Sequence, residues 1–196
     1  MDDKIIESCI SYIETLFAND AGGHDVQHSL RVYKNACNIA KFECNCNLFV
    51  VKLAALLHDV DDHKLFNTVN NENAREFLLN HNIDNDLIEY ICEVINCISF
   101  SKNRGSRPST LEGKIVQDAD RLDAIGAIGI ARTFAFGGER KRQISDTVQH
   151  FYDKLLLLKD EMNTNEGKRI AKYRHDLMVE FLEELEDNMN LRKIPD

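Results

Sequence analysis

Proline is almost absent from this chain, and its absence constrains the fold more than any other feature of the sequence. Only Pro108 and Pro195 occur among 196 residues. Because proline ends or kinks helices, long stretches without it favour helices wherever apolar residues recur at helical spacing. The pattern predicts an all-α protein with helices over residues 3–17, 25–42, 48–58, 71–80, 84–97 and 111–122, and two long helices over residues 144–162 and 164–189.

The segment DAIGAIGIARTFAFGG, residues 123–138, is apolar and rich in glycine and alanine. Small side chains of this kind allow helices to approach each other closely. Thr164, followed by Gly167, predicts a turn and a cap at the start of the last helix. That helix is expected to turn toward the core a stripe made of Ile170, Tyr173, Leu177, Phe181 and Leu185.

Charge and composition narrow the classes of function. The net charge of −9 repels a phosphate backbone, so no nucleic-acid grip is expected. The length and the 43% hydrophobic content suit a single globular domain over residues 1–196. No apolar run approaches the roughly 20 residues of a membrane span, and the N-terminus lacks a secretory signal. We therefore expect a cytoplasmic protein whose six cysteines are reduced.

The stretch LAALLHDVDDHK, residues 53–64, is an unusual end for a helix. It begins with the apolar residues of a buried helix and then places His58, Asp59, Asp61 and Asp62 within five positions. Carboxylates at a helix C-terminus face the negative end of the helix dipole, which disfavours them. Either this end emerges into water, or a positive ion lies beside it.

Further metal-ligand candidates lie on other predicted helices. His28 falls within the second helix, and Asp118, Asp120 and Asp123 interrupt an otherwise apolar helix rich in small residues. Burying a carboxylate there without a partner would be costly, and a metal ion would remove that cost. Mixed imidazole and carboxylate ligands suit Mn, Fe, Ni, Co or Zn better than Ca.

This arrangement resembles the HD-domain phosphohydrolases, whose metal motif is H…HD…D. In this chain the residues similar to that motif are His28, the pair His58-Asp59, and Asp120. The family's A-D-R-L pattern favours Asp120 over Asp118. The blocks GHDVQHSLRV, ALLHDVDDHK, QDADRLDAIGAIGIARTF and LLLLKDEMNTNEGKRIAKYRHDLMVEFL resemble the small YpgQ-type branch of that superfamily. The resemblance covers nearly the whole chain.

The resemblance implies an all-helical bundle with a metal site between core helices, a metal-binding core over about residues 22–125 and a C-terminal helical part over about residues 140–190. It implies hydrolysis of a phosphoester or phosphoanhydride bond, often in a nucleotide, by a nucleoside triphosphate pyrophosphohydrolase or a 5′-nucleotidase. Relatives with two metals carry extra histidines between the HD pair and the last aspartate. Only His63 and His81 lie there, which favours one divalent ion: Mn²⁺ first, with Mg²⁺, Co²⁺, Ni²⁺, Fe²⁺ or Zn²⁺ as alternatives.

The remaining roles are hypotheses. Asp62 is the general acid/base candidate, because it would lie one turn beyond His58 if the helix continued and because some relatives carry a catalytic carboxylate there; Asp61 is the second choice. The candidates for binding the phosphorylated substrate are Arg31, Lys64, Arg121, Asp123 and His24. The basic group Lys168, Arg169, Lys172 and Arg174 is more typical of a solvated helix face.

Two other classes of function remain open: a metal- and nucleotide-binding regulatory module without turnover, and a di-iron oxygenase-like protein. The shortage of extra histidines argues against two irons. The long last helix could also support a homodimer.

Overall fold

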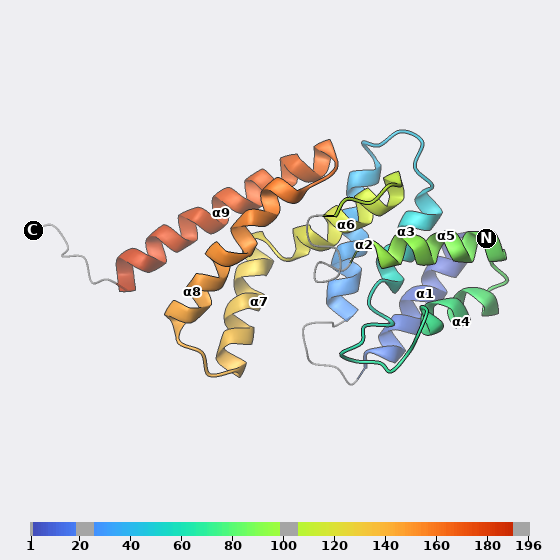
Figure 1. Cartoon of the computed structure of the whole chain (residues 1–196), viewed down its shortest axis with the longest axis horizontal. Helices are drawn as coiled ribbons and strands as arrows, with labels where there is room; N and C mark the ends of the chain where they lie inside the picture. The colour runs from blue at the N-terminus through green and yellow to red at the C-terminus, as the bar shows by residue number, and fades with distance from the viewer. Residues whose placement is uncertain (1, 19–25, 99–105, 190–196) are drawn as a thin grey trace, which may run out of the picture. The chain divides into compact units, whose positions relative to one another are not determined.

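The structure is a computed structural model that describes residues 2–18, 26–98 and 106–189. Within these residues it contains nine α-helices, one 3-10 helix and no strand, so the predicted all-α class is confirmed (Figure 1). The chain divides into two compact units, Met1–Arg121 and Leu122–Asp196. One domain over residues 1–196 remains a prediction, and the division falls near residue 125, where the expected metal-binding core ends.

The described part of the first unit is built from helices that match the predicted ranges to within two residues at each end. They are α1 (Asp2–Leu16), α2 (Val26–Ala40), α3 (Leu48–Leu57), α4 (Glu72–Asn80), α5 (Asn85–Asn96) and α6 (Leu111–Asp123). The last of these helices continues two residues into the second unit.

Helix α3 lies at the centre of the first unit, packed against α1, α2 and α5. Between Val50 and Leu57 every side chain except that of Lys52 is buried. A helix that is apolar all round must be enclosed, and this one is. It begins at Asn47, whose side-chain oxygen accepts hydrogen bonds from the backbone N–H groups of Phe49 and Val50 and so satisfies two first-turn donors.

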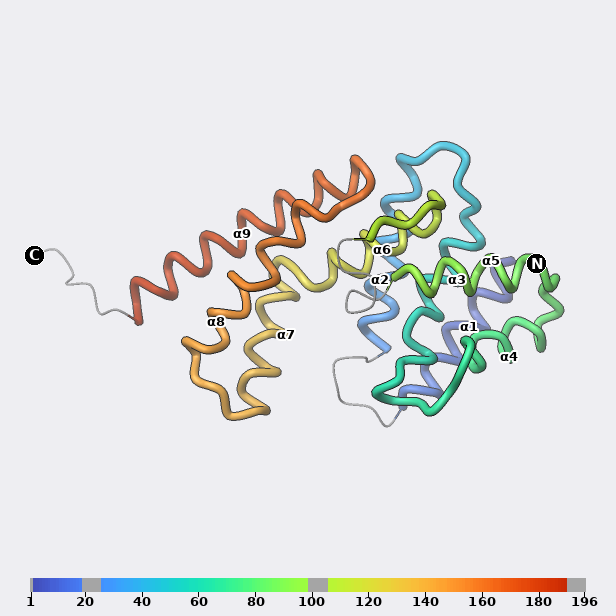
Figure 2. Tube along the Cα trace, in the orientation of Figure 1, coloured from blue at the N-terminus to red at the C-terminus, as the bar shows by residue number. Residues whose placement is uncertain are grey.

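The second unit contains α7 (Gly126–Glu139), α8 (Ile144–Asp153), the 3-10 helix η1 (Leu155–Glu161) and α9 (Asn165–Met189). Helix α7 packs against α8 and α9, as the trace in Figure 2 shows. A Cβ atom at Gly137 would lie 2.5 Å from the Thr147 hydroxyl oxygen on α8, so only glycine permits this approach. The prediction that small residues in this segment allow close helix approach is confirmed.

The prediction of one helix over residues 144–162 is wrong. Helix α8 ends at Asp153, and η1 follows after Lys154. A 3-10 helix has three residues per turn, so side chains three positions apart share a face. Leu155 and Leu158 are accordingly buried, while Leu157 between them is 48% exposed. The run of four leucines is thus divided between the core and the surface.

The start of α9 is capped as predicted, because the Thr164 hydroxyl accepts a hydrogen bond of 3.0 Å from the Gly167 N–H. The predicted core stripe is right in part: Ile170, Leu177, Phe181 and Leu185 are half-buried, whereas Tyr173 is 73% exposed. The buried residues of the inner face include Ala171, Met178 and Leu182. Arg174 was expected on a solvated face, but its Nη1 donates a hydrogen bond of 2.5 Å to the Leu122 carbonyl.

All six cysteines carry free thiols, as expected. Burial raises the pKa of the Cys9 and Cys92 thiols, which keeps them protonated and poorly reactive at neutral pH. None of the helices in the described ranges is both long and apolar enough to cross a membrane.

Candidate metal centre

Four predicted metal ligands meet at one place in the first unit. His28 lies on α2, His58 is the C-cap residue of α3, Asp59 follows it, and Asp120 lies in the last turn of α6. Their side chains are only 3% to 22% exposed. Three helices thus deliver two imidazoles and two carboxylates to a largely buried point.

The distances between the donor atoms are short. The Nε2 atoms of His28 and His58 are 3.2 Å apart. Asp59 Oδ2 lies 3.5 Å from the first of these nitrogens and 3.3 Å from the second. Asp120 Oδ1 lies 3.4 and 3.9 Å from the same two nitrogens. Donors from His28, His58 and Asp120 all lie within 4.8 Å of one another.

This spacing fits a divalent transition-metal ion. Ligand atoms about 2.1 Å from a tetrahedral ion lie roughly 3.4 Å from one another, and six-coordinate ions bring neighbouring ligands slightly closer. The observed separations of 3.2 to 3.9 Å bracket that value. Imidazole nitrogen combined with carboxylate oxygen is also a donor set that Mn, Fe, Co, Ni and Zn accept. The residues present therefore fit the group that the resemblance implies.

The second ring nitrogen of His58 supports the same arrangement. His58 Nδ1 lies 3.0 Å from the Ala55 carbonyl oxygen, which can only accept, so Nδ1 carries the hydrogen. In a neutral imidazole this leaves a lone pair on Nε2, which faces the other donors. Burial lowers the pKa of His58, but Asp59 and Asp120 outweigh it and the net pKa is raised. The cluster therefore favours added positive charge.

The two acid/base candidates differ in their surroundings. Helix α3 ends at Leu57, so Asp62 lies in a turn rather than on a continued helix. Its Oδ1 accepts a hydrogen bond of 2.8 Å from the Lys64 N–H, and its side chain is 18% exposed. Both oxygens of Asp61 instead accept backbone hydrogen bonds, from Asn73 at 2.9 Å and Ala74 at 3.0 Å. No local sequence pattern predicted these hydrogen bonds of Asp61, because the partners lie 12 and 13 positions away.

The candidates for substrate binding differ in how exposed their side chains are. Arg31 is half-buried, Lys64 is exposed and Arg121 is only 3% exposed. His24 lies outside the described residues. Asp123 belongs to the second unit, where its Oδ2 lies 2.6 Å from Nη1 of Arg132, a partner that the sequence analysis missed.

Neither histidine between the HD pair and Asp120 joins the cluster. The side chain of His63 is 63% exposed. The ring of His81 stacks on Phe77 with centroids 4.2 Å apart, and its Nδ1 is bonded to the Phe77 carbonyl. Within the described residues, these two histidines therefore add no ligand to the cluster.

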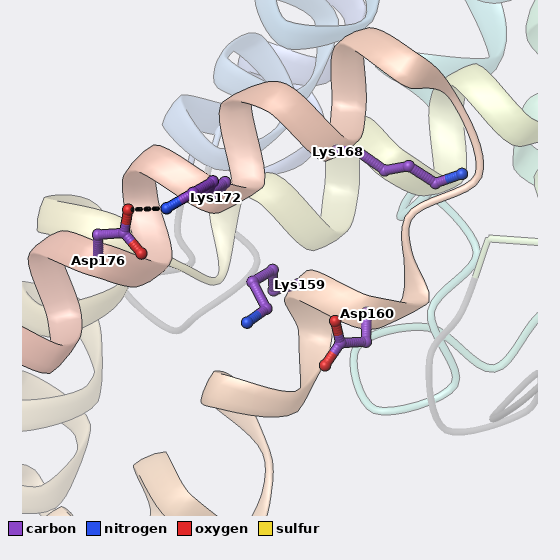
Figure 3. Close-up of a pocket in the computed structure, with 5 residues that line it drawn as sticks. All are labelled: Lys159, Asp160, Lys168, Lys172 and Asp176. Carbon is purple, nitrogen blue, oxygen red and sulfur yellow. Dashed lines mark hydrogen bonds and ion pairs between the residues drawn. The ribbon is translucent and has the colours of Figure 1, made fainter.

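The second unit holds a surface hollow of about 330 Å³ between η1 and α9 (Figure 3). Its lining residues are Lys159, Asp160, Lys168, Lys172 and Asp176. Lys172 pairs with Asp176 at 2.5 Å, one helical turn away. Mixed charge of this kind is usual for a solvated helix face, as expected for Lys168, Arg169 and Lys172, so we assign the hollow no ligand.

Comparison with known proteins gives consistent matches. A family model described as HD domain matches residues 25–125. The uncharacterized protein YpgQ of Bacillus subtilis (strain 168) is 37% identical over 195 residues, covering 95% of this chain and 94% of that protein. The crystal structure of Bacillus subtilis YpgQ in complex with ADP has a TM-score of 0.82 at 34% identity, covering 95% of this chain and 96% of that one. An HD-superfamily hydrolase from Bacillus thuringiensis has a TM-score of 0.81 at 36% identity, covering 98% and 100%.

Proposed function

This chain belongs to the HD domain family, and on that basis we propose that it is a metal-dependent phosphohydrolase that cleaves a phosphoester or phosphoanhydride bond of a nucleotide. The observation that carries the proposal is the convergence of His28, His58, Asp59 and Asp120: the two imidazole Nε2 atoms lie 3.2 Å apart, and each lies 3.3 to 3.9 Å from an oxygen of either carboxylate. The ADP bound in the crystal structure of YpgQ supports a nucleotide as the substrate.

The four converging side chains hold one divalent ion in this proposal, with Mn²⁺ as the first choice. When bound, such an ion acts as a Lewis acid on a phosphoryl oxygen and lowers the pKa of water. His58 contributes Nε2, held in place by the hydrogen bond from Nδ1 to the Ala55 carbonyl. Asp59 and Asp120 contribute the negative charge that favours a cation over a neutral occupant.

Asp62 carries the proton in this proposal. The Lys64 N–H binds only Oδ1, and among the described residues Oδ2 accepts no hydrogen bond. A carboxylate with one oxygen anchored and the other available can take a proton from the attacking water or give one to the leaving oxygen. Asp61 is a poor candidate, because both of its oxygens are engaged by backbone N–H groups.

Arg31 and Lys64 are the proposed phosphate-binding cations, since charge neutralisation is the main demand of phosphoryl transfer. The side chain of Lys64 is exposed and that of Arg31 is half-buried. We assign no substrate role to Asp123, whose carboxylate is paired with Arg132.

The test is a panel of nucleoside mono-, di- and triphosphates and cyclic nucleotides, incubated with purified protein and Mn²⁺. Product masses distinguish release of phosphate from release of pyrophosphate. We expect wild type to cleave at least one member and Asp59→Ala to cleave none at a comparable rate. Tight nucleotide binding with no product from any member would overturn the proposal in favour of a regulatory module.

A further inference from the structure

The turn that follows the HD pair is tied to the start of α4 by three hydrogen bonds. Asp61 accepts from the Asn73 N–H through Oδ1 and from the Ala74 N–H through Oδ2. In return, Asn73 Nδ2 donates to the Val60 carbonyl at 2.6 Å. We name this reciprocal arrangement, made of Val60, Asp61, Asn73 and Ala74, the Asp61–Asn73 clamp.

The clamp takes the place of an ordinary helix cap. The residue before α4, Asn71, has a left-handed backbone (φ 56°), and its side chain makes no capping bond. The first N–H groups of a helix need acceptors, and a carboxylate is the acceptor that the helix dipole favours most. Asp61 supplies it from a segment that lies earlier in the chain. Removing the Asp61 carboxylate would therefore leave the Asn73 and Ala74 N–H groups without this acceptor.

Helix α4 is a fixed platform for this attachment. Arg75 on α4 forms a two-pronged ion pair with Glu89 on α5. On another side, the ring of Tyr12 on α1 lies tilted against Phe77, with ring centroids 5.0 Å apart. The Tyr12 hydroxyl also donates to the carbonyl of Asn73 itself. The clamp residue on α4 is thus held from α1 as well as by its own helix.

The turn needs such an attachment because α3 has already ended. After Leu57 the chain continues as turns, so helical hydrogen bonds do not fix Asp62. Its backbone N–H donates to the Asp59 carbonyl at 3.0 Å, and its carbonyl accepts from Leu65 and Phe66. These bonds shape the turn locally, whereas the bonds of Asp61 and the Val60 carbonyl to Asn73 and Ala74 tie it to α4. Through one peptide bond the clamp determines where the Asp62 carboxylate stands.

We propose that Asp61 is a positioning residue for the hydrolysis reaction and acts through Asp62: the Asp61–Asn73 clamp holds the turn so that the Asp62 carboxylate reaches the reacting group. This inference rests on the proposed function. Asp61 itself touches neither metal nor substrate. Its role is to replace the missing helix beyond His58 with a second support from α4.

The test compares Asp61→Asn and Asn73→Ala with Glu72→Gln, which removes a carboxylate from the first turn of α4 without touching the clamp. We expect both clamp variants to lower kcat by about 10- to 100-fold, the range typical of residues that orient a catalytic group. KM and Mn²⁺ affinity should stay within roughly threefold of wild type, and Glu72→Gln should behave as wild type. Amide exchange at Asn73 and Ala74 reports whether the clamp is open.

A double-mutant cycle with Asp62→Asn tests whether Asp61 acts through Asp62. If Asp61 acts through Asp62, then Asp61→Asn lowers kcat in wild type but adds nothing in the Asp62→Asn background. An equal loss in both backgrounds, a parallel loss of Mn²⁺ affinity, or faster exchange with unchanged kcat would overturn the inference. Should Asp61→Asn not fold, Asn73→Ala enters the same cycle. A wild type that cleaves no nucleotide refutes the proposed function instead.

Discussion

Asp120 and Asp123 lie three residues apart on α6, but their carboxylates have different partners in the two units of the molecule. In the first unit, Asp120 faces the imidazoles of His28 and His58 at 3.4 and 3.9 Å. In the second unit, Asp123 lies 2.6 Å from the guanidinium of Arg132 and is 2% exposed. Asp123 has a permanent cation supplied by the chain. Asp120 faces the other candidate metal ligands, which in the proposed function hold a cation from solution together with it.

The largest expected effect separates the two carboxylates by activity. Asp120→Asn should lower kcat/KM by about 10³-fold, because loss of the ion removes several kcal/mol of charge stabilisation and each 1.36 kcal/mol corresponds to a factor of ten. Mn²⁺ affinity, measured by titration calorimetry, should fall with it. Asp123→Asn should keep Mn²⁺ affinity within roughly threefold of wild type. Equal losses of affinity in both variants would contradict the comparison.

The next largest effect is on stability, and here Asp123 matters more than Asp120. Asp123→Asn should lower the free energy of unfolding by about 3 kcal/mol, the lower end for breaking a buried ion pair, since Arg132 is 35% exposed. Urea unfolding measures the change. Asp176→Asn is the matched control: it breaks the exposed Lys172 pair on α9 and should leave the free energy of unfolding close to that of wild type. Similar costs for the two variants would show that the Asp123 pair contributes little.

Metal addition should stabilise one variant and not the other. At a free Mn²⁺ concentration 100 times its Kd, wild type should gain about 2.7 kcal/mol in unfolding free energy by mass action. Asp123→Asn should gain the same amount from its lower starting point, whereas Asp120→Asn should gain almost nothing. Thermal unfolding with and without Mn²⁺ checks this, with EDTA treatment as the reversal. A metal response lost in Asp123→Asn would place the ion elsewhere.

The smallest effect concerns a third carboxylate of α6, which is held by hydrogen bonds alone. Glu112 accepts from the Asn47 N–H and the Tyr90 hydroxyl, both at 2.6 Å. Burial raises the pKa of Glu112, but these two hydrogen bonds outweigh it and hold the pKa below its usual value. The stabilisation is therefore present above pH 4.3, the ordinary pKa of glutamate, and is lost as the pH falls through the lower folded pKa.

Glu112→Gln should accordingly cost about 1.5 kcal/mol at pH 7, typical of hydrogen bonds to a charged group. The difference from wild type should shrink below pH 4, when the wild-type carboxylate is itself protonated. Urea unfolding at several pH values measures both. A cost that does not depend on pH would mean that shape, rather than charge, is what Glu112 provides.

Local patterns predicted much of this molecule. Apolar spacing placed the helices of the first unit to within two residues, and Thr164 and Gly167 marked the cap of α9. The candidate ligands His28, His58, Asp59 and Asp120 do converge. These features were accessible because each depends on residues within one helix turn or on a family motif.

Features that depend on partners far away in the sequence could not be predicted from it. The contacts of Asp61 with Asn73 and Ala74 join segments 12 and 13 residues apart, so the sequence kept Asp61 as the second acid/base candidate after Asp62. Arg174 looked like a solvated cation until its bond to the Leu122 carbonyl, 52 positions away, appeared. The 3-10 turn at Leu155–Glu161 likewise follows from packing rather than from helix propensity.

Under the proposed function, the enclosure of α3 limits how this protein could acquire a different substrate. Because α1, α2 and α5 pack against α3, it cannot slide or rotate without opening the core. The position of His58 at its end is therefore fixed. Among the described residues, exposed segments such as residues 63–65, whose side chains reach water, can change with less effect on the core. Directed evolution toward a new nucleotide should accumulate substitutions in such segments and leave α3 untouched.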